Sequence, residues 1–176
     1  MSLKTLILAA GKGTRMKSDL PKVIHKVCGI PMVKKITDIC STIGSENNIL
    51  ILGHKKEESL KVLEDGEHVV QAEQLGTGHA VMQAQEKLKD HNGTVMVLCG
   101  DTPLLTKKTL ENLYKEHKKS GAVTTILTSI YENPFGYGRI VKENDNVKAI
   151  VEEKDATEEE RKIQEVNAGV YCFETQ

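Results

Sequence analysis

Short apolar runs alternate with helical patterns along the first two thirds of the chain. The run at residues 5–10 has almost no polar side chains, as expected for a strand buried on both faces of a parallel sheet. Similar β-type runs occur at residues 48–52, 68–71, 94–98 and 122–130. Strands that alternate with helices form right-handed βαβ units, so we expect an α/β fold with a doubly wound, mostly parallel, Rossmann-like sheet.

Two segments between these strands show amphipathic helical spacing. Between residues 32 and 43 the apolar side chains fall on one helical face, and Pro31 suits the first turn. A second amphipathic helix is indicated around residues 110–114, and Thr106 is its expected N-cap. Helices of this kind cover the faces of a parallel sheet.

After residue 130 the pattern changes to short β-type runs with more glycine. Runs at residues 139–141 and 147–151 flank a polar turn at residues 143–146, which predicts a hairpin over the sheet. Residues 155–161 are acidic at the start and basic at the end, which favours a short helix. Residues 165–173 form the last expected strand.

Composition limits the class of protein. The 176 residues are enough for one domain, which we divide into a doubly wound part at 1–130 and a β-rich part at 131–176. The 24 basic and 25 acidic residues nearly cancel, so no global field favours nucleic acid or a membrane. Neither a membrane-spanning run nor a signal peptide is apparent, and the four cysteines lack zinc spacing, so we expect a cytoplasmic protein with reduced thiols.

The first strand leads into a loop that is rich in glycine and in positive charge. Gly11 and Gly13 permit a sharp turn and allow the main chain to approach a ligand closely. Four cations follow at Lys12, Arg15, Lys17 and Lys22. The forked donors of Arg15 match phosphate oxygens, so a polyanion is the expected ligand.

Two common phosphate-binding motifs fail in this loop. A Walker A loop and a dinucleotide fingerprint both require glycine where this chain has Met16. Neither a P-loop ATPase nor a nicotinamide enzyme is therefore favoured. A solvated, lysine-rich surface loop is the alternative interpretation of the charges.

The strand at residues 94–98 leads to a carboxylate at Asp101. Ligands of open α/β folds bind at the carboxyl ends of the strands. Because Mg²⁺ commonly takes one or two protein ligands together with substrate phosphates and water, Asp101 is the expected Mg²⁺ ligand. The alternative is a strand-end turn in which the aspartate bonds to its own backbone.

Several segments together resemble the sugar nucleotidyltransferase family. The first is LAAGKGTRM at residues 8–16 with LPK at residues 20–22, and others follow in family order at residues 71–80, 99–104, 136–140, 150–157 and 166–169. More narrowly, the chain resembles the uridylyltransferase domain of the bacterial bifunctional N-acetylglucosamine-1-phosphate uridyltransferases. The resemblance extends along nearly the whole chain.

This resemblance implies transfer of a uridylyl group from UTP to N-acetylglucosamine 1-phosphate, with release of pyrophosphate, in cell-wall precursor synthesis. The attacking phosphate is already ionised because its second pKa is about 6. The protein must therefore align two anions and neutralise their charge rather than supply a strong base. Arg15 and Lys22 are the expected catalytic phosphate contacts, with Mg²⁺ at Asp101.

The resemblance also implies the binding residues. For the nucleotide they are Leu8, Ala9, Ala10, Gly11, Gly13, Gln71, Gly76 and Thr77. For the sugar they are Gly138, Glu152 and Asn167 in the β-rich part, together with Thr102, which follows Asp101. The choice of Glu152 over Glu153 rests on motif alignment. Besides its expected nucleotide contact, Thr77 is suited to cap a helix that begins in this segment.

Two alternatives stay open. The chain transfers another nucleotide, such as a thymidylyl, guanylyl or cytidylyl group, or it is a nucleotide-sugar binding module without catalysis. In the resembling family the domain extends further, supplies a metal-binding asparagine, and in bifunctional members precedes a β-helix acetyltransferase domain. We therefore expect a C-terminally truncated chain without the acetyltransferase domain and the oligomerisation region.

Overall fold

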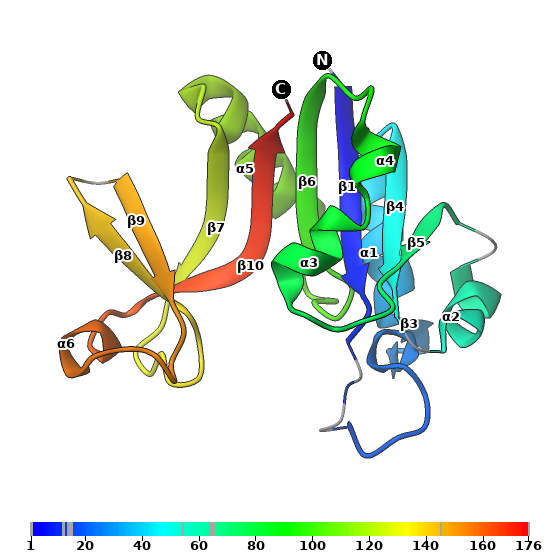
Figure 1. Cartoon of the computed structure of the whole chain (residues 1–176), viewed down its shortest axis with the longest axis horizontal. Helices are drawn as coiled ribbons and strands as arrows, with labels where there is room; N and C mark the ends of the chain where they lie inside the picture. Colours follow the sequence, from blue (N-terminus) through cyan, green and yellow to red (C-terminus); the bar gives the residue numbers. More distant parts are fainter. Residues whose placement is uncertain are drawn as a thin grey trace. The chain divides into compact units, whose positions relative to one another are not determined.

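The computed structural model describes residues 2–11, 13, 16–53, 55–63, 66–144 and 146–175. The chain forms two compact units (Figure 1). The first comprises Met1–Thr125 together with Tyr171–Gln176, and the second comprises Ile126–Val170.

The strands are β1 Ser2–Ala9, β2 Lys26–Val27, β3 Ile30–Pro31, β4 Asn47–Leu52, β5 His68–Val70, β6 Gly93–Cys99, β7 Thr124–Ile130, β8 Arg139–Glu143, β9 Asn146–Val151 and β10 Glu165–Glu174. The α-helices are α1 Met32–Thr42, α2 Lys56–Leu63, α3 Thr77–Met82, α4 Gln85–Leu88, α5 Lys107–Ser120 and α6 Glu158–Arg161. A 3₁₀ turn, η2, covers Lys22–Ile24.

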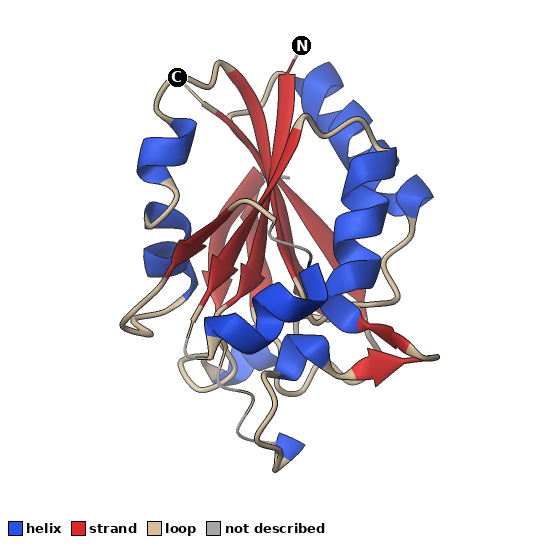
Figure 2. Cartoon of the chain, turned by 90° about the vertical axis from the view of Figure 1, so that its right-hand side faces the viewer, coloured by secondary structure: helices blue, strands red, loops and turns tan. Residues whose placement is uncertain are grey.

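The first unit is built on a parallel sheet in the order β5-β4-β1-β6. The last residues of β10 add to it antiparallel to β6, with Cys172 opposite Met96. Leu6 lies opposite Ile49 on one side and Val97 on the other, and all three are buried. Figure 2 shows helices on both faces of this sheet. The prediction of a doubly wound, mostly parallel sheet is confirmed.

Local sequence signals account for the long helix α5. The side-chain oxygen of Thr106 accepts a hydrogen bond from the Thr109 amide at 3.2 Å, which confirms the predicted N-cap. At the other end Gly121 adopts a left-handed φ of 63°, as C-terminal glycines commonly do. Leu110 and Leu113 are buried, as the spacing predicted.

The second unit contains the predicted hairpin, formed by β8 and β9. It does not lie over a sheet as expected, because β8 pairs with β10 at Arg139 and Val166 and so extends the sheet. Buried Arg139 donates to Glu153 at 2.6 Å and also to the Tyr137 carbonyl. The predicted helix at 155–161 is shorter and begins at Glu158, because Thr157 is extended and forms a capping box with Glu160.

Five short elements were not expected from the sequence pattern, namely α2, α4, the two strands β2 and β3, and the turn η2. Ser59 is the one buried residue of α2, and α4 buries none. Apolar periodicity is weak in such elements, so it does not indicate them. Among the described residues no helix has the length and apolar character required to cross a membrane, and the four cysteines are free thiols.

A buried polar cluster joins α5 to the end of β10. His117 is almost completely buried and bonds to Thr125 at 2.8 Å and to Glu174 at 3.1 Å. Burial lowers the pKa of His117, against the opposing effect of the nearby Glu174 carboxylate. The hydrogen bond from Lys118 lowers the pKa of Glu174.

We predict that in His117→Gln the free energy of unfolding decreases less than in the wild type when the pH is lowered. An unfolded histidine binds its proton near a pKa of about 6.5, whereas folded His117 binds it only at lower pH. The unfolded state therefore binds more protons, and the free energy of unfolding falls as pH decreases from about 7 to about 5. Urea unfolding at several pH values measures this slope, and parallel curves for the wild type and His117→Gln would contradict it.

Candidate functional site

The carboxyl ends of β1 and β6 bring the first loop and Asp101 to one edge of the sheet. The two strands are parallel neighbours, and the pairing continues beyond β6 because the Gly100 amide donates to the Leu8 carbonyl at 2.9 Å. On the other side of β1, a Cβ on Gly53 would lie 2.5 Å from the Ala10 carbonyl oxygen. A glycine at position 53 therefore permits the close approach of these strand ends.

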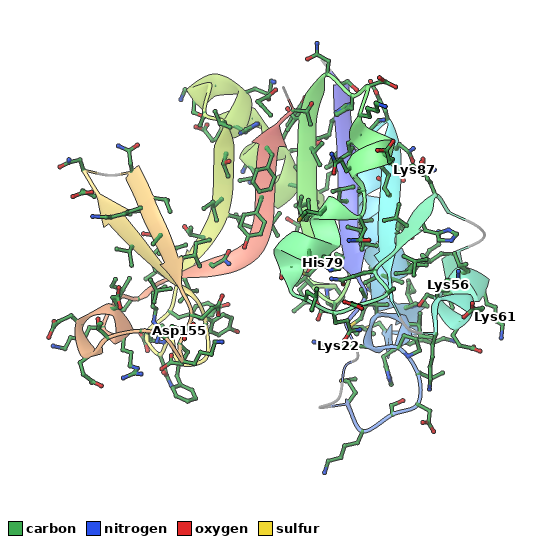
Figure 3. The ribbon with its side chains drawn as sticks, in the orientation of Figure 1. Lys22, Lys56, Lys61, His79, Lys87 and Asp155 are labelled. Carbon is green, nitrogen blue, oxygen red and sulfur yellow. The ribbon has the colours of Figure 1, made fainter. Side chains whose placement is uncertain are left out.

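A cavity of about 290 Å³ opens at this edge. Eight of the expected residues line it: Leu8, Ala10, Gly11, Lys22, Gln71, Gly76, Thr77 and Asp101. Figure 3 shows Lys22 where the chain has left β1, and His79 on α3. Segments that are far apart in the sequence thus meet at the edge where α/β folds bind ligands.

The cavity contains a close ion pair. The Lys22 ammonium lies 2.6 Å from an oxygen of Asp101, and each side chain is about one third exposed at 34% and 29%. Gly13 packs beneath Lys22, because a Cβ there would lie 2.6 Å from the Lys22 Cβ, and its φ is 61°. Burial, with a smaller contribution from Asp101, raises the pKa of the neighbouring Cys99 to about 11. Cys99 is therefore a neutral thiol in the cavity wall at neutral pH.

The glutamine segment forms the opposite wall. The buried Gln71 amide donates to the Gly76 carbonyl and to His79 Nδ1, both at 3.1 Å. Helix α3 begins at Thr77 with Gly76 as N-cap, and no side chain caps it. The suggestion that Thr77 caps this helix is therefore wrong. Gly76 has a φ of 103°, a conformation that favours glycine.

Gln74 was missed by the sequence analysis and links the two walls. Its side-chain amide donates to the Ala10 carbonyl at 2.5 Å, 64 positions away in the chain. It also lines the cavity. Gln74 lies in the segment at residues 71–80 that carries part of the family resemblance, so this segment could have indicated it. Val23, Ala80 and Cys99 also line the cavity, but apolar and thiol side chains carry no distinctive signal in the sequence.

Several expected residues lie elsewhere. Arg15 lies outside the described residues. Ala9 is buried within β1, and the hydroxyl of Thr102 donates to the Cys99 carbonyl at 2.7 Å in the turn after β6. Within the described chain, neither Ala9 nor Thr102 is among the residues that line the cavity.

The second unit brings three expected sugar-binding residues together. The backbone N–H of Asn167 donates to the Gly138 carbonyl at 2.9 Å, and its side-chain oxygen accepts from the Gly169 amide at 2.9 Å. A Cβ on Gly138 would lie 3.1 Å from an oxygen of Glu152. The neighbouring Glu153 instead bonds to Arg139 and, at 3.0 Å, to the Gly136 amide. Glu152 therefore lies against Gly138, whereas Glu153 is held by Arg139 and Gly136.

The donor set for a cation is small. Over the described ranges, no group of three or more histidine, cysteine, aspartate or glutamate side chains is arranged to hold a metal ion. Asp101 is the carboxylate in the cavity. Such a site suits a cation that completes its coordination with substrate oxygens and water rather than with a protein cage.

Comparison with known proteins gives matches along nearly the whole chain. The chain is 53% identical over 173 residues to the "Bifunctional protein GlmU" of Bacillus licheniformis, which covers 97% of this chain and 38% of that protein. A protein of the same name from Alkaliphilus metalliredigens is 50% identical over 177 residues, covering 99% of this chain and 39% of that protein. The chain thus spans well under half the length of these curated relatives.

The fold is similar to that of UDP-glucose pyrophosphorylase in a crystal structure with UDP-glucose, at a TM-score of 0.77 and 19% identity. That match covers 99% of this chain and 76% of the pyrophosphorylase chain. A family model described as nucleotidyl transferase matches residues 4–176, the same stretch that forms the sheet, the glycine loop and the cavity. The chain therefore belongs to the nucleotidyl transferase family.

Proposed function

We propose that this chain catalyses uridylyl transfer from UTP to N-acetylglucosamine 1-phosphate, giving UDP-N-acetylglucosamine and pyrophosphate. The observation that carries the proposal is the pairing of Lys22 with Asp101 in a cavity between a glycine loop and a glutamine segment. The high identity to GlmU proteins supports the same proposal.

The chemistry requires alignment and charge neutralisation. A phosphate oxygen of the sugar phosphate attacks the α-phosphorus of UTP, one P–O bond forms, and the bond to the β-phosphate breaks in line with it. No proton must be removed from the attacking phosphate, because its second pKa is about 6. Lys22 is placed to neutralise phosphate charge, and the open backbone at Gly11 allows a phosphate to approach closely.

We propose Asp101 as the residue that holds Mg²⁺. Its carboxylate follows β6, is partly exposed, and lies in the same cavity as Lys22. One carboxylate with phosphate oxygens and water is a common environment for this ion. When bound, Mg²⁺ would neutralise charge on the polyphosphate.

For the sugar we propose Glu152 and Asn167, with Gly138 as the residue that lets Glu152 approach the backbone. Glu153 is engaged by Arg139 and the Gly136 amide, which supports the choice of Glu152. A carboxylate and an amide hydrogen-bond hydroxyl and acetamido groups, and a sugar without matching groups leaves them unpaired.

An assay of pyrophosphate release tests the proposed reaction. The purified chain is incubated with Mg²⁺, N-acetylglucosamine 1-phosphate and one nucleotide at a time from UTP, dTTP, CTP and GTP. We expect the highest kcat/KM with UTP. Preference for another nucleotide would replace the uridylyl assignment, and nucleotide-sugar binding without pyrophosphate release would identify a binding module.

A change at Gly11 tests the glycine loop as a ligand contact. No atom lies within 4 Å of a Cβ placed on Gly11, so Gly11→Ala should leave the Tm of the free protein unchanged. The added methyl group projects into a cavity-lining position, so we expect UTP affinity to fall at least about tenfold, a loss of about 1.4 kcal/mol. Calorimetric titration with UTP measures this.

Gly78→Ala is the matched control for this experiment. A Cβ on Gly78 also meets no atom within 4 Å, and Gly78 lies in α3 but does not line the described cavity. Its UTP affinity should equal that of the wild type. Equal UTP affinities for Gly11→Ala and the wild type would refute the loop assignment.

Separate changes at Lys22 and Asp101 distinguish phosphate contact from metal binding. Lys22→Met removes a phosphate partner, so UTP affinity should fall about tenfold or more with and without Mg²⁺. Asp101→Asn should abolish the gain in UTP affinity that Mg²⁺ gives. Because the pair is partly exposed, neither change should alter the free energy of unfolding by more than about 1 kcal/mol.

The readouts are calorimetric titration with UTP at two Mg²⁺ concentrations and urea unfolding of both variants. Wild-type affinity in Lys22→Met, or an undiminished Mg²⁺ effect in Asp101→Asn, would show that the corresponding role is assigned incorrectly.

A further inference from the structure

Lys55 holds a disfavoured backbone conformation next to the cavity. It lies in the connection between β4 and α2 and has a φ of 62°. This left-handed region is disfavoured for residues with a Cβ and favours glycine. Strained residues persist where the surrounding structure requires them, and they concentrate at functional sites.

The side chain of Lys55 binds a segment that is distant in the sequence. Its ammonium group donates to the Asp19 carbonyl oxygen at 2.5 Å. The Asp19 carboxylate is farther away, at 4.0 Å, and is fully exposed. The backbone carbonyl is therefore the principal acceptor, and the contact fixes main chain rather than a mobile side chain.

The segment that Lys55 binds is part of the site. A hollow of about 190 Å³ is lined by Lys55, Asp19 and Pro21, and it shares Ala10, Gly11 and Gln74 with the larger cavity. Pro21 directly precedes Lys22, whose ammonium contacts Asp101. Residues 18–21 thus lead directly into Lys22, the first residue of η2.

Pro21 is buried and its carbonyl accepts a hydrogen bond from the Ile24 amide at 3.2 Å, whereas residues 18–20 are exposed. Residues 18–20 form bends rather than a helix or strand, and the Leu20 amide donates to the Ser18 hydroxyl within the same segment. Among the described residues, Lys55 is the one side chain outside residues 18–21 that hydrogen-bonds to them. Loss of the Lys55 ammonium would thus remove the side-chain tether that joins this segment to the β4–α2 connection.

We propose that Lys55 is a positioning residue for phosphate binding. Its ammonium group holds the Asp19 carbonyl and so fixes the segment that places Lys22, which rests on the proposed function of Lys22 as a phosphate contact. Glycine would adopt the backbone conformation of residue 55 with less strain than lysine. The advantage of lysine at this position is therefore the hydrogen bond from its ammonium group to the Asp19 carbonyl. Removal of the tether should weaken binding of the polyphosphate more than binding of the nucleoside monophosphate.

The test is a Lys55→Gly variant, titrated calorimetrically with UTP and with UMP in the presence of Mg²⁺. Glycine relieves the backbone strain, so the Tm should stay equal to that of the wild type or rise by about 1–3 °C. UTP affinity should nevertheless fall about tenfold, as for loss of other contacts that orient a ligand-binding group. UMP affinity should change less than twofold. Lys55→Arg, which keeps a cationic donor, should restore part of the UTP affinity.

Two matched controls separate the tether from other effects. Asp19→Ala removes the exposed carboxylate but keeps the carbonyl that Lys55 binds, so its UTP affinity should equal that of the wild type. Cys28→Gly relieves a similar φ of 53° in the exposed turn between β2 and β3. It should leave UTP affinity unchanged.

The outcomes separate this inference from the proposed function. If the wild type binds UTP and Lys55→Gly binds it equally well, Lys55 has no positioning role. Equal losses of UTP and UMP affinity in Lys55→Gly would also overturn the inference. If the wild type itself binds no UTP, the proposed function fails, and the role of Lys55 fails with it.

Discussion

The parallel pairing of β1 with β6 is the constraint on which the first unit's site depends. It places the end of β1, the glycine loop and Asp101 at one edge, and the Gly100–Leu8 hydrogen bond extends the alignment beyond the strand itself. The strands that make this alignment are buried and apolar, so the alignment rests on the core. Gly53 lets β4 approach the same edge without a steric conflict at Ala10. The chemistry at the edge is therefore a consequence of how the core strands pair.

The cavity contains two opposite charges and polar side chains that already form hydrogen bonds within the protein. Lys22 and Asp101 neutralise each other in contact. Under the proposed function, an incoming phosphate would compete with Asp101 for Lys22, and a cation would compete with Lys22 for Asp101. Gln71 and Gln74 hold the cavity walls through bonds to Gly76 and Ala10. Such bonds fix the walls before a ligand arrives, which lowers the entropy that ligand binding must overcome.

The elements and site residues with a strong local sequence pattern could be predicted from the sequence. Apolar runs predict the buried strands, and a threonine at a helix start predicts the α5 cap. Asp101 lies in the cavity after β6, as its place in the sequence suggests, and its role as a metal ligand stays a prediction. The place of Gln74 in the cavity wall could have been inferred from its segment at residues 71–80. Its hydrogen bond to the Ala10 carbonyl depends on tertiary structure. Lys55 carries no sequence signal, because its backbone angle and its contact with Asp19, 36 positions away, arise only in the folded chain. Arg15 stays a prediction, since it lies outside the described residues.

The most direct measurement is calorimetric titration of this chain with UDP-N-acetylglucosamine and Mg²⁺, with dTDP-glucose as the control ligand. We expect saturable binding of UDP-N-acetylglucosamine and at least about tenfold weaker binding of dTDP-glucose, because both base and sugar differ. Equal affinity for the two ligands, or tighter binding of dTDP-glucose, would contradict it.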